Sequence, residues 1–220
     1  MKNINFNLER RLRRFSIPNL MRYIVIGQGI VFALLYIWPT LGMRLAGLLS
    51  LTRSGLLHGQ IWRLLTFVFM PPSSSPIFIL FALYFYYMIG EGLERQWGVV
   101  KFNLFYWIGM LCAILACLIT GYAGNTFLNL SLFLAYASIW PDEQVLLFMF
   151  LPVKMKYLAI LDVVLYLYQF IVGTASTRIT IVLCLLNVIL FVGGDLINTL
   201  RKESRYWETR RNFRKVMWKK

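Results

Sequence analysis

The stretch from Gly59 to Phe102 decides the architecture of this chain. It begins with Gln60-Ile61-Trp62-Arg63-Leu64-Leu65-Thr66-Phe67, passes Pro71-Pro72-Ser73-Ser74-Ser75-Pro76 and is apolar from Ile77 to Ile89. It ends with Gly90-Glu91-Gly92-Leu93-Glu94-Arg95-Gln96-Trp97-Gly98-Val99-Val100-Lys101-Phe102. Adjacent Trp and Arg side chains are typical of a segment at the membrane interface, where both reach the lipid headgroups. The stretch therefore predicts an interfacial segment, a break, one membrane span and a charged turn.

The composition indicates an integral membrane protein. Apolar residues make up 59% of the 220 residues and charged residues 15%, whereas soluble chains average about half apolar and a quarter charged. Apolar stretches close to the roughly 20 residues that span a bilayer recur along the sequence. We predict an all-α membrane protein with six transmembrane helices, at residues 19–38, 76–89, 102–120, 126–140, 157–173 and 179–200.

Two connecting segments carry signals of their own. Residues 40–60 are too polar to span a bilayer and too rich in leucine for a solvated loop, so we expect short interfacial helices in this first outer loop. Residues 145–150 form an apolar patch before Pro152-Val153-Lys154-Met155-Lys156. This pattern predicts a connector that lies on the membrane surface.

The net charge of +14 is compatible with nucleic-acid binding or with the charge asymmetry of a membrane protein. The positions of the basic residues distinguish the two. With six spans, all but four of the 23 basic residues lie on the side that holds both termini; the four are Arg44, Arg53, Arg63 and Arg178. Basic residues accumulate on the cytoplasmic side of membrane proteins. We therefore predict no nucleic-acid partner, a basic cytoplasmic segment at 1–18, a membrane domain at 19–200 and a basic cytoplasmic tail at 201–220. Both basic termini are expected to contact anionic lipids.

Two motifs in the opening stretch resemble the rhomboid superfamily. They are W-R-L-L-T-F at residues 62–67 and G-x-x-L-E-x-x-W-G-x-x-K-F at residues 90–102, and the Phe-Val-Phe-Met-Pro-Pro passage at 67–72 is most similar to the derlin-like, non-proteolytic branch. The resemblance implies a six-transmembrane-helix rhomboid-like bundle with interfacial helices in the first outer loop. It also implies structural roles for the motif residues, which hold that loop and the turn after the second span: Trp62, Arg63, Glu91, Glu94 and Gly98.

A rhomboid protease would carry Gly-x-Ser-Gly on its fourth helix and a histidine on its sixth, because a hydroxyl needs a nearby base to become a nucleophile. The single histidine, His58, lies in the first outer loop, and Asn187 stands where the histidine is expected. Thr126 occupies the serine position, Phe127 replaces a glycine, and Ser131 has the wrong neighbours. We therefore predict no catalytic residues and a degenerate site near Thr126, Ser131 and Asn187.

Other catalytic arrangements find little support. The predicted spans contain no lysine that could form a catalytic Ser-Lys pair. Asp162 and Asp195 could form a catalytic pair of acids. They are expected instead to reach the interface or to pair with one of three basic residues, Lys154, Lys156 or Arg201. The three cysteines lie in apolar runs without metal-ligand spacing, so we predict neither a metal nor another cofactor.

Amides recur along the fourth and sixth predicted spans. Asn125 and Asn129 share one helix face, and Asn187, Gly194 and Asn198 form a stripe on the other helix. Buried amides in a membrane must face other helices or a cavity. Packing between helices is the favoured interpretation, and the alternative is that Asn125, Asn129 and Asn187 bind transmembrane clients.

The function that the resemblance implies is that of a pseudoprotease, which binds transmembrane segments of client proteins and aids membrane-protein quality control or trafficking. The alternative is an intramembrane protease with a non-standard catalytic site; a transporter is disfavoured because internal repeats are absent. A membrane protease or an AAA-type ATPase is a further expected partner. Because the chain carries no soluble domain, we expect a multi-pass protein of the bacterial inner membrane.

Overall fold

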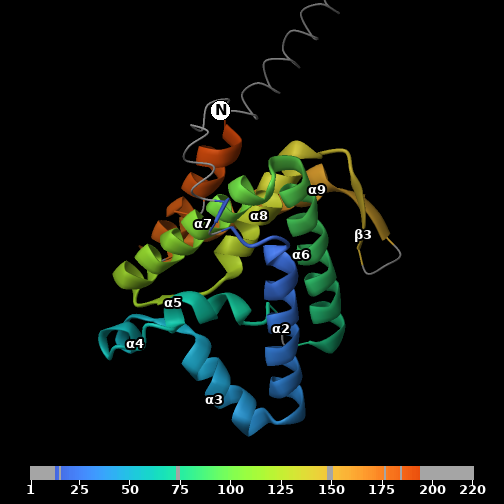
Figure 1. The fold of residues 1–220 in the computed structure, drawn as a ribbon. Helices are drawn as coiled ribbons and strands as arrows, with labels where there is room; N and C mark the ends of the chain where they lie inside the picture. The colour runs from blue at the N-terminus through green and yellow to red at the C-terminus, as the bar shows by residue number, and fades with distance from the viewer. Residues whose placement is uncertain are drawn as a thin grey trace, which may run out of the picture.

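The computed structural model describes residues 13–14, 16–72, 75–147, 151–175, 177–183 and 185–193, and they are mainly helical (Figure 1). Most of the predicted N-terminal segment 1–18 and the whole tail 201–220 lie outside the described residues. The same holds for three residues singled out above, Gly194, Asp195 and Asn198.

Four helices among the described residues are long and apolar enough to cross a membrane. They are α2 (Leu20–Ile37), α6 (Pro76–Trp97), α7 (Val99–Thr120) and α9 (Met155–Val172). The predicted fourth and sixth spans correspond to shorter apolar helices, α8 (Thr126–Ile139) and Thr177–Gly193. The helical membrane class is therefore confirmed, and the count of six spans stays a prediction.

The first loop (residues 38–72) folds into short elements: α3 (Pro39–Leu49), β1 (Leu51–Thr52), α4 (Arg53–Leu57), α5 (Arg63–Thr66) and the 3-10 helix η1 (Phe67–Phe69). Residues 40–60 contain short helices, as predicted, and their location at the membrane interface stays a prediction. The pairing of β1 with β2 (Tyr122–Ala123), Leu51 opposite Ala123, was not predicted. This pair holds the loop against the end of α7.

The connector after α8 is an antiparallel hairpin of β3 (Gln144–Leu147) and β4 (Leu151–Lys154), with Gln144 opposite Lys154. Sequence analysis predicted a surface connector there but no strands. The Asp142 carboxylate lies 2.7 Å from the Lys156 Nζ and 3.7 Å from the Lys154 Nζ. The hydrogen bond from Lys156 and the two positive charges lower the pKa of Asp142 below its usual range. These contacts bring the start of α9 beside the end of α8.

A single residue, Gly98, separates the 22-residue helices α6 and α7. Its φ of +82° and ψ of 159° belong to a region that residues with a Cβ rarely occupy. The Glu94 carboxylate accepts a hydrogen bond from the backbone N–H of Asn19 at 2.8 Å, and the Lys101 ammonium lies 4.9 Å from the centre of the Trp97 ring. The charged turn of the opening stretch thus joins α6 to α7 and also holds the entry to α2.

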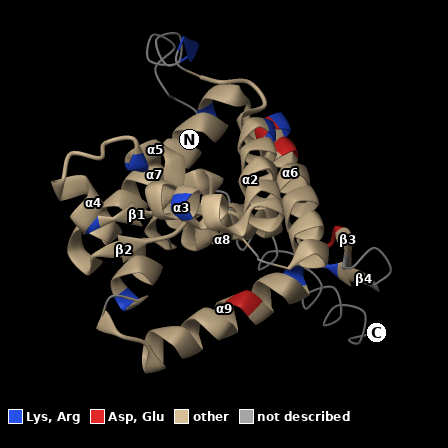
Figure 2. Ribbon diagram, turned by 90° about the horizontal axis from the view of Figure 1, so that it is seen from below, with Lys and Arg blue, Asp and Glu red and all other residues tan. Residues whose placement is uncertain are grey.

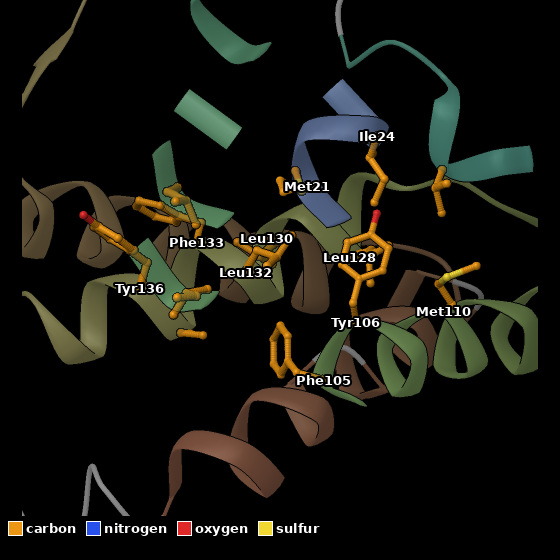
Figure 3. Close-up of a cluster of buried hydrophobic side chains, with 14 of the residues drawn as sticks. Met21, Ile24, Phe105, Tyr106, Met110, Leu128, Leu130, Leu132, Phe133 and Tyr136 are labelled. Atoms are coloured by element: carbon orange, nitrogen blue, oxygen red, sulfur yellow. The ribbon is translucent and has the colours of Figure 1, made fainter. Parts of the chain in front are cut away.

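Helix α8 is the centre of the bundle. Nine of its 14 residues are buried, whereas α9 buries only Met155 of its 18. A helix that is apolar on all sides is expected to be surrounded by protein or lipid, and α8 packs against α6, α7 and α9. Figure 3 shows side chains of α2, α7 and α8 meeting in one cluster, with Met21, Tyr106 and Leu130 among them. Figure 2 shows α9 along one edge of the molecule.

Candidate functional site

Arg63 of the predicted interfacial motif is buried inside the first loop, with 8% of its surface exposed. Its guanidinium donates to the Gly47 carbonyl at 2.7 Å, to the Ser50 carbonyl and to the Gln60 side chain. The two carbonyls belong to the end of α3, where a helix leaves acceptors unsatisfied and favours a cation. Trp62 beside it is half exposed. Arg63 therefore connects parts of the first loop and does not reach out to solvent.

Asn125 precedes α8 and fastens it to the first loop. Its amide donates to the Val68 carbonyl at 3.2 Å and to the Met70 carbonyl at 2.7 Å. The Gln28 amide of α2 donates to the same Val68 carbonyl at 2.8 Å. These buried hydrogen bonds connect α2, η1 and α8, so Asn125 has a structural task in addition to any role in binding.

The structure brings two residues of the predicted degenerate site together. Ser131 of α8 and Asn187 of the last described helix are both about 1% exposed, and the Asn187 amide donates to the Ser131 Oγ at 3.4 Å. The Ser131 hydroxyl donates in turn to the Leu128 carbonyl of its own helix at 2.7 Å. A backbone carbonyl is not a base that can take the hydroxyl proton, so this geometry does not activate the serine.

The space beside Ser131 and Asn187 is small. A cavity of about 20 Å³ lies between them and Gly109, which is room for roughly one water molecule. The Asn187 Oδ1 faces no hydrogen-bond partner among the described residues, so such a water has an acceptor. A Cβ at Gly109 would collide with Leu128 and lie 2.9 Å from the Asn187 Nδ2. The glycine thus allows the three helices to approach closely and leaves no room for a peptide.

Thr126 and His58 do not join this pair. Thr126 is exposed at the start of α8 and lines a different pocket. The His58 Nδ1 lies 2.7 Å from the Ser54 carbonyl in the first loop. The predicted site therefore divides into a closed Ser131–Asn187 pair and a separate opening that contains Thr126.

That opening, called here the lateral pocket, has a volume of about 330 Å³ and lies between α6, α8 and α9. Aromatic and aliphatic side chains form most of its wall, and they surround Tyr86, Thr126, Asn129 and Asp162. Its size is at the lower end of the range for ligand pockets in proteins. The lining residues are Phe81, Ala82, Phe85, Tyr86, Thr126, Asn129, Leu130, Phe133, Leu158, Leu161, Asp162 and Tyr166.

Two polar side chains in the wall of the lateral pocket are of special interest. Asn129 is 2% exposed, and neither its nitrogen nor its oxygen makes a hydrogen bond of ordinary geometry, although the Tyr86 hydroxyl is close enough to interact with it. Asp162, half-buried in α9, was expected to reach the interface or to pair with Lys154, Lys156 or Arg201. Both lysines contact Asp142, and Arg201 lies outside the described residues. Sequence analysis did not single out Tyr86, because a tyrosine within an apolar run carries no positional signal.

Among the described residues no cluster of three or more His, Cys, Asp or Glu side chains could hold a metal ion. Cys112 and Cys117 are free thiols in α7.

Comparison with curated proteins and with solved structures gives no match. A family model described as "Eukaryotic integral membrane protein (DUF1751)" matches residues 22–191, which include Arg63, the Ser131–Asn187 pair and the lateral pocket. The description contradicts the expectation of a bacterial inner membrane. That expectation rested on the lack of a soluble domain, which does not distinguish one bilayer from another because the hydrocarbon core is about 30 Å thick in each. The chain belongs to this family of eukaryotic integral membrane proteins.

Proposed function

We propose that this protein is a six-span, rhomboid-like pseudoprotease that binds transmembrane segments of client proteins and aids their quality control or trafficking. The motifs that resemble the rhomboid superfamily support the scaffold, since Arg63 organises the first loop and Gly98 forms the turn between α6 and α7. The proposal includes the basic tail 201–220 as a contact for anionic lipids and for a membrane protease or AAA-type ATPase.

The closed Ser131–Asn187 pair supports the non-proteolytic part of the proposal. A protease must admit a peptide bond to its nucleophile and supply a base within about 3 Å of it. Here the hydroxyl donates to Leu128 and accepts from an amide, and the adjoining cavity has about 20 Å³. Both observations favour packing between helices at this position.

The lateral pocket is the observation that carries the binding part. α6 and α9 both pack on α8, and the pocket lies between them. α9 buries little of its own surface, and its exposed side chains include Leu161 on the pocket wall. A helix of another protein that docked here would cover apolar surface and offer hydrogen-bond partners to Asn129, whose nitrogen and oxygen make no hydrogen bond of ordinary geometry among the described residues. Polar groups inside a membrane are costly unless paired.

Site-specific photocrosslinking in vesicles tests the binding. A photoreactive residue at Ala82, on the pocket wall of α6, is expected to capture a co-reconstituted single-span protein. The same residue at Leu80, which is 71% exposed and lies two residues away on another side of the helix, should capture mainly lipid. Equal capture of the single-span protein from both positions, or none from Ala82, contradicts the proposal.

A cleavage assay tests the competing enzymatic function. The wild-type protein and its Ser131→Ala and Thr126→Ala variants are incubated with a transmembrane substrate in liposomes. We expect no processing by any of the three. Cleavage by the wild-type protein that disappears in either variant would establish a protease and overturn the pseudoprotease assignment.

A further inference from the structure

The lateral pocket places an acid and an amide at membrane depth. Among the described residues no basic side chain forms an ion pair with Asp162, and Asn129 has only the Tyr86 hydroxyl close enough to interact with it. Asp162 lies seven residues after Met155 in α9, which is about 10 Å along the helix axis. Asp162 is the one acidic residue of α9. Tyr86, on the same pocket wall, lies at the middle of α6. The polar part of the pocket is therefore well inside the apolar length of these helices.

Several described basic side chains make their contacts away from Asp162. Lys154 and Lys156 bind Asp142, and the Arg178 guanidinium donates to the Phe170 and Ile171 carbonyls at the end of α9. Lys101 lies over the Trp97 ring. None of these contacts neutralises Asp162. An ionisable side chain inside a membrane normally faces a cavity or a partner of opposite charge, and here the chain itself supplies the cavity.

We infer that the lateral pocket selects client transmembrane helices that carry a lysine or arginine near the middle of their span. This inference rests on the proposed function and names the chemistry of its client. The basic group would form an ion pair with the Asp162 carboxylate and donate a hydrogen bond to the Asn129 Oδ1. A volume of about 330 Å³ accommodates a side chain or two, with the client helix outside, against α6 and α9.

Charge complementarity makes this client more favourable than an apolar one. A basic residue near the middle of a span is costly in lipid, and so is an acid without a partner. Docking removes both costs with one contact and gives the Asn129 amide a partner as well. An apolar helix would cover the pocket and leave the Asp162 carboxylate without an ion-pair partner, which is unfavourable. The pocket therefore favours a basic client helix over an apolar one, because the apolar helix offers no partner to the acid of the pocket.

The test uses the full-length protein in phosphatidylcholine vesicles, with a photoreactive residue at Leu161 on the pocket wall. The clients are leucine-rich helices of about 20 residues that carry a central lysine, a central glutamate, a lysine near one end, or leucine throughout. We expect roughly tenfold more capture of the central-lysine helix than of the all-leucine helix, as one charge-assisted hydrogen bond implies. The helix with a lysine near one end should be captured to the same extent as the all-leucine helix.

Variants of Asp162 make the test specific. Asp162→Asn should abolish the preference for lysine and leave capture of the all-leucine helix unchanged, and Asp162→Lys should shift the preference to the glutamate helix. The matched control is Val164→Asn, which changes an exposed residue two positions along α9, on another side of the helix. This control should retain the lysine preference.

The outcomes separate this inference from the function on which it rests. Equal capture of lysine and leucine helices by the wild-type protein, or a preference that persists in Asp162→Asn, overturns the inference while binding itself stands. Loss of the preference when ethanolamine lipids are added means that a lipid amine takes the site, and this also overturns it. Failure to capture any helix from Leu161 and Ala82 overturns the proposed function itself.

Discussion

The structure makes a quantitative prediction for Arg63, because its guanidinium joins three parts of the first loop. Arg63→Ala removes its hydrogen bonds to the Gly47 and Ser50 carbonyls and to the Gln60 side chain. Hydrogen bonds to a charged group contribute roughly 1.5–3 kcal/mol each. Water can replace the donor at Gly47, which is exposed, and at Gln60, which is partly exposed. We therefore expect a net loss of roughly 2–4 kcal/mol in the free energy of unfolding.

A matched control and a double-mutant cycle test whether the loss of stability comes from the contacts of the Arg63 guanidinium. Arg44→Ala removes an exposed arginine from the same loop and should change stability by about 0.5 kcal/mol or less. A Cβ at Gly55 would lie 2.5 Å from the Arg63 Nε and 2.8 Å from its Cδ. Gly55→Ala should therefore destabilise the wild-type protein by displacing the guanidinium. With Arg63→Ala the space is free, and the same change should be neutral or stabilising, since alanine favours a helix.

The assay is unfolding of the purified protein in detergent, followed by tryptophan fluorescence as denaturant is added. The four proteins of the cycle give a coupling free energy, expected to be about 1 kcal/mol or more between residues in contact. Additive effects of Gly55→Ala and Arg63→Ala would refute the packing argument. An Arg63→Ala variant as stable as Arg44→Ala would refute the claim that the guanidinium holds the loop.

Three further predictions use the same assay. Gly98→Ala should cost roughly 1–3 kcal/mol, because the backbone region at this turn is strained for any residue with a Cβ; a stability equal to wild type contradicts this. Asn125→Leu should cost about 1–3 kcal/mol, because two buried hydrogen bonds to the first loop are lost, whereas the exposed Arg53→Ala should change little. The pKa of Asp142 is lowered in the folded protein, so its ion pair with Lys156 stabilises the fold. This stabilisation is fully present above the pKa of an unfolded aspartate, about 3.9. It is lost as the pH falls through the lower pKa of Asp142 in the folded protein. Asp142→Asn should therefore narrow the difference in stability between pH 6 and pH 3, and an unchanged difference argues against the pair.

The predictions from sequence were most successful where one physical signal dominates. The lengths of the apolar runs predicted α2, α6, α7 and α9, because a bilayer sets the length of a span. The glycine and charged residues around Gly98 predicted the turn between α6 and α7. The strand pairs β1–β2 and β3–β4 were missed, because each is only two to four residues long and pairs segments without an alternating pattern.

The candidate site was only partly predictable. Sequence analysis selected Ser131, Asn129 and Asn187, because polar residues in apolar helices stand out. It could not tell that Ser131 and Asn187 close on each other while Asn129 faces a pocket. That difference depends on the rotation of α8 between its neighbours. For Asp162 the sequence left the interface, Lys154, Lys156 and Arg201 open; the structure places both lysines beside Asp142, and Arg201 lies outside the described residues.

The amino-acid sequence by itself determined that this protein is a helical membrane protein, since partition into lipid depends on composition and on the length of apolar runs. It also determined the turn at Gly98, where local backbone sterics decide. Only the tertiary structure decided that Arg63 is buried, that Ser131 and Asn187 form a closed pair, and that Asn129 and Asp162 share the lateral pocket. These features depend on contacts between segments far apart in the chain, whose distances follow from how the helices pack.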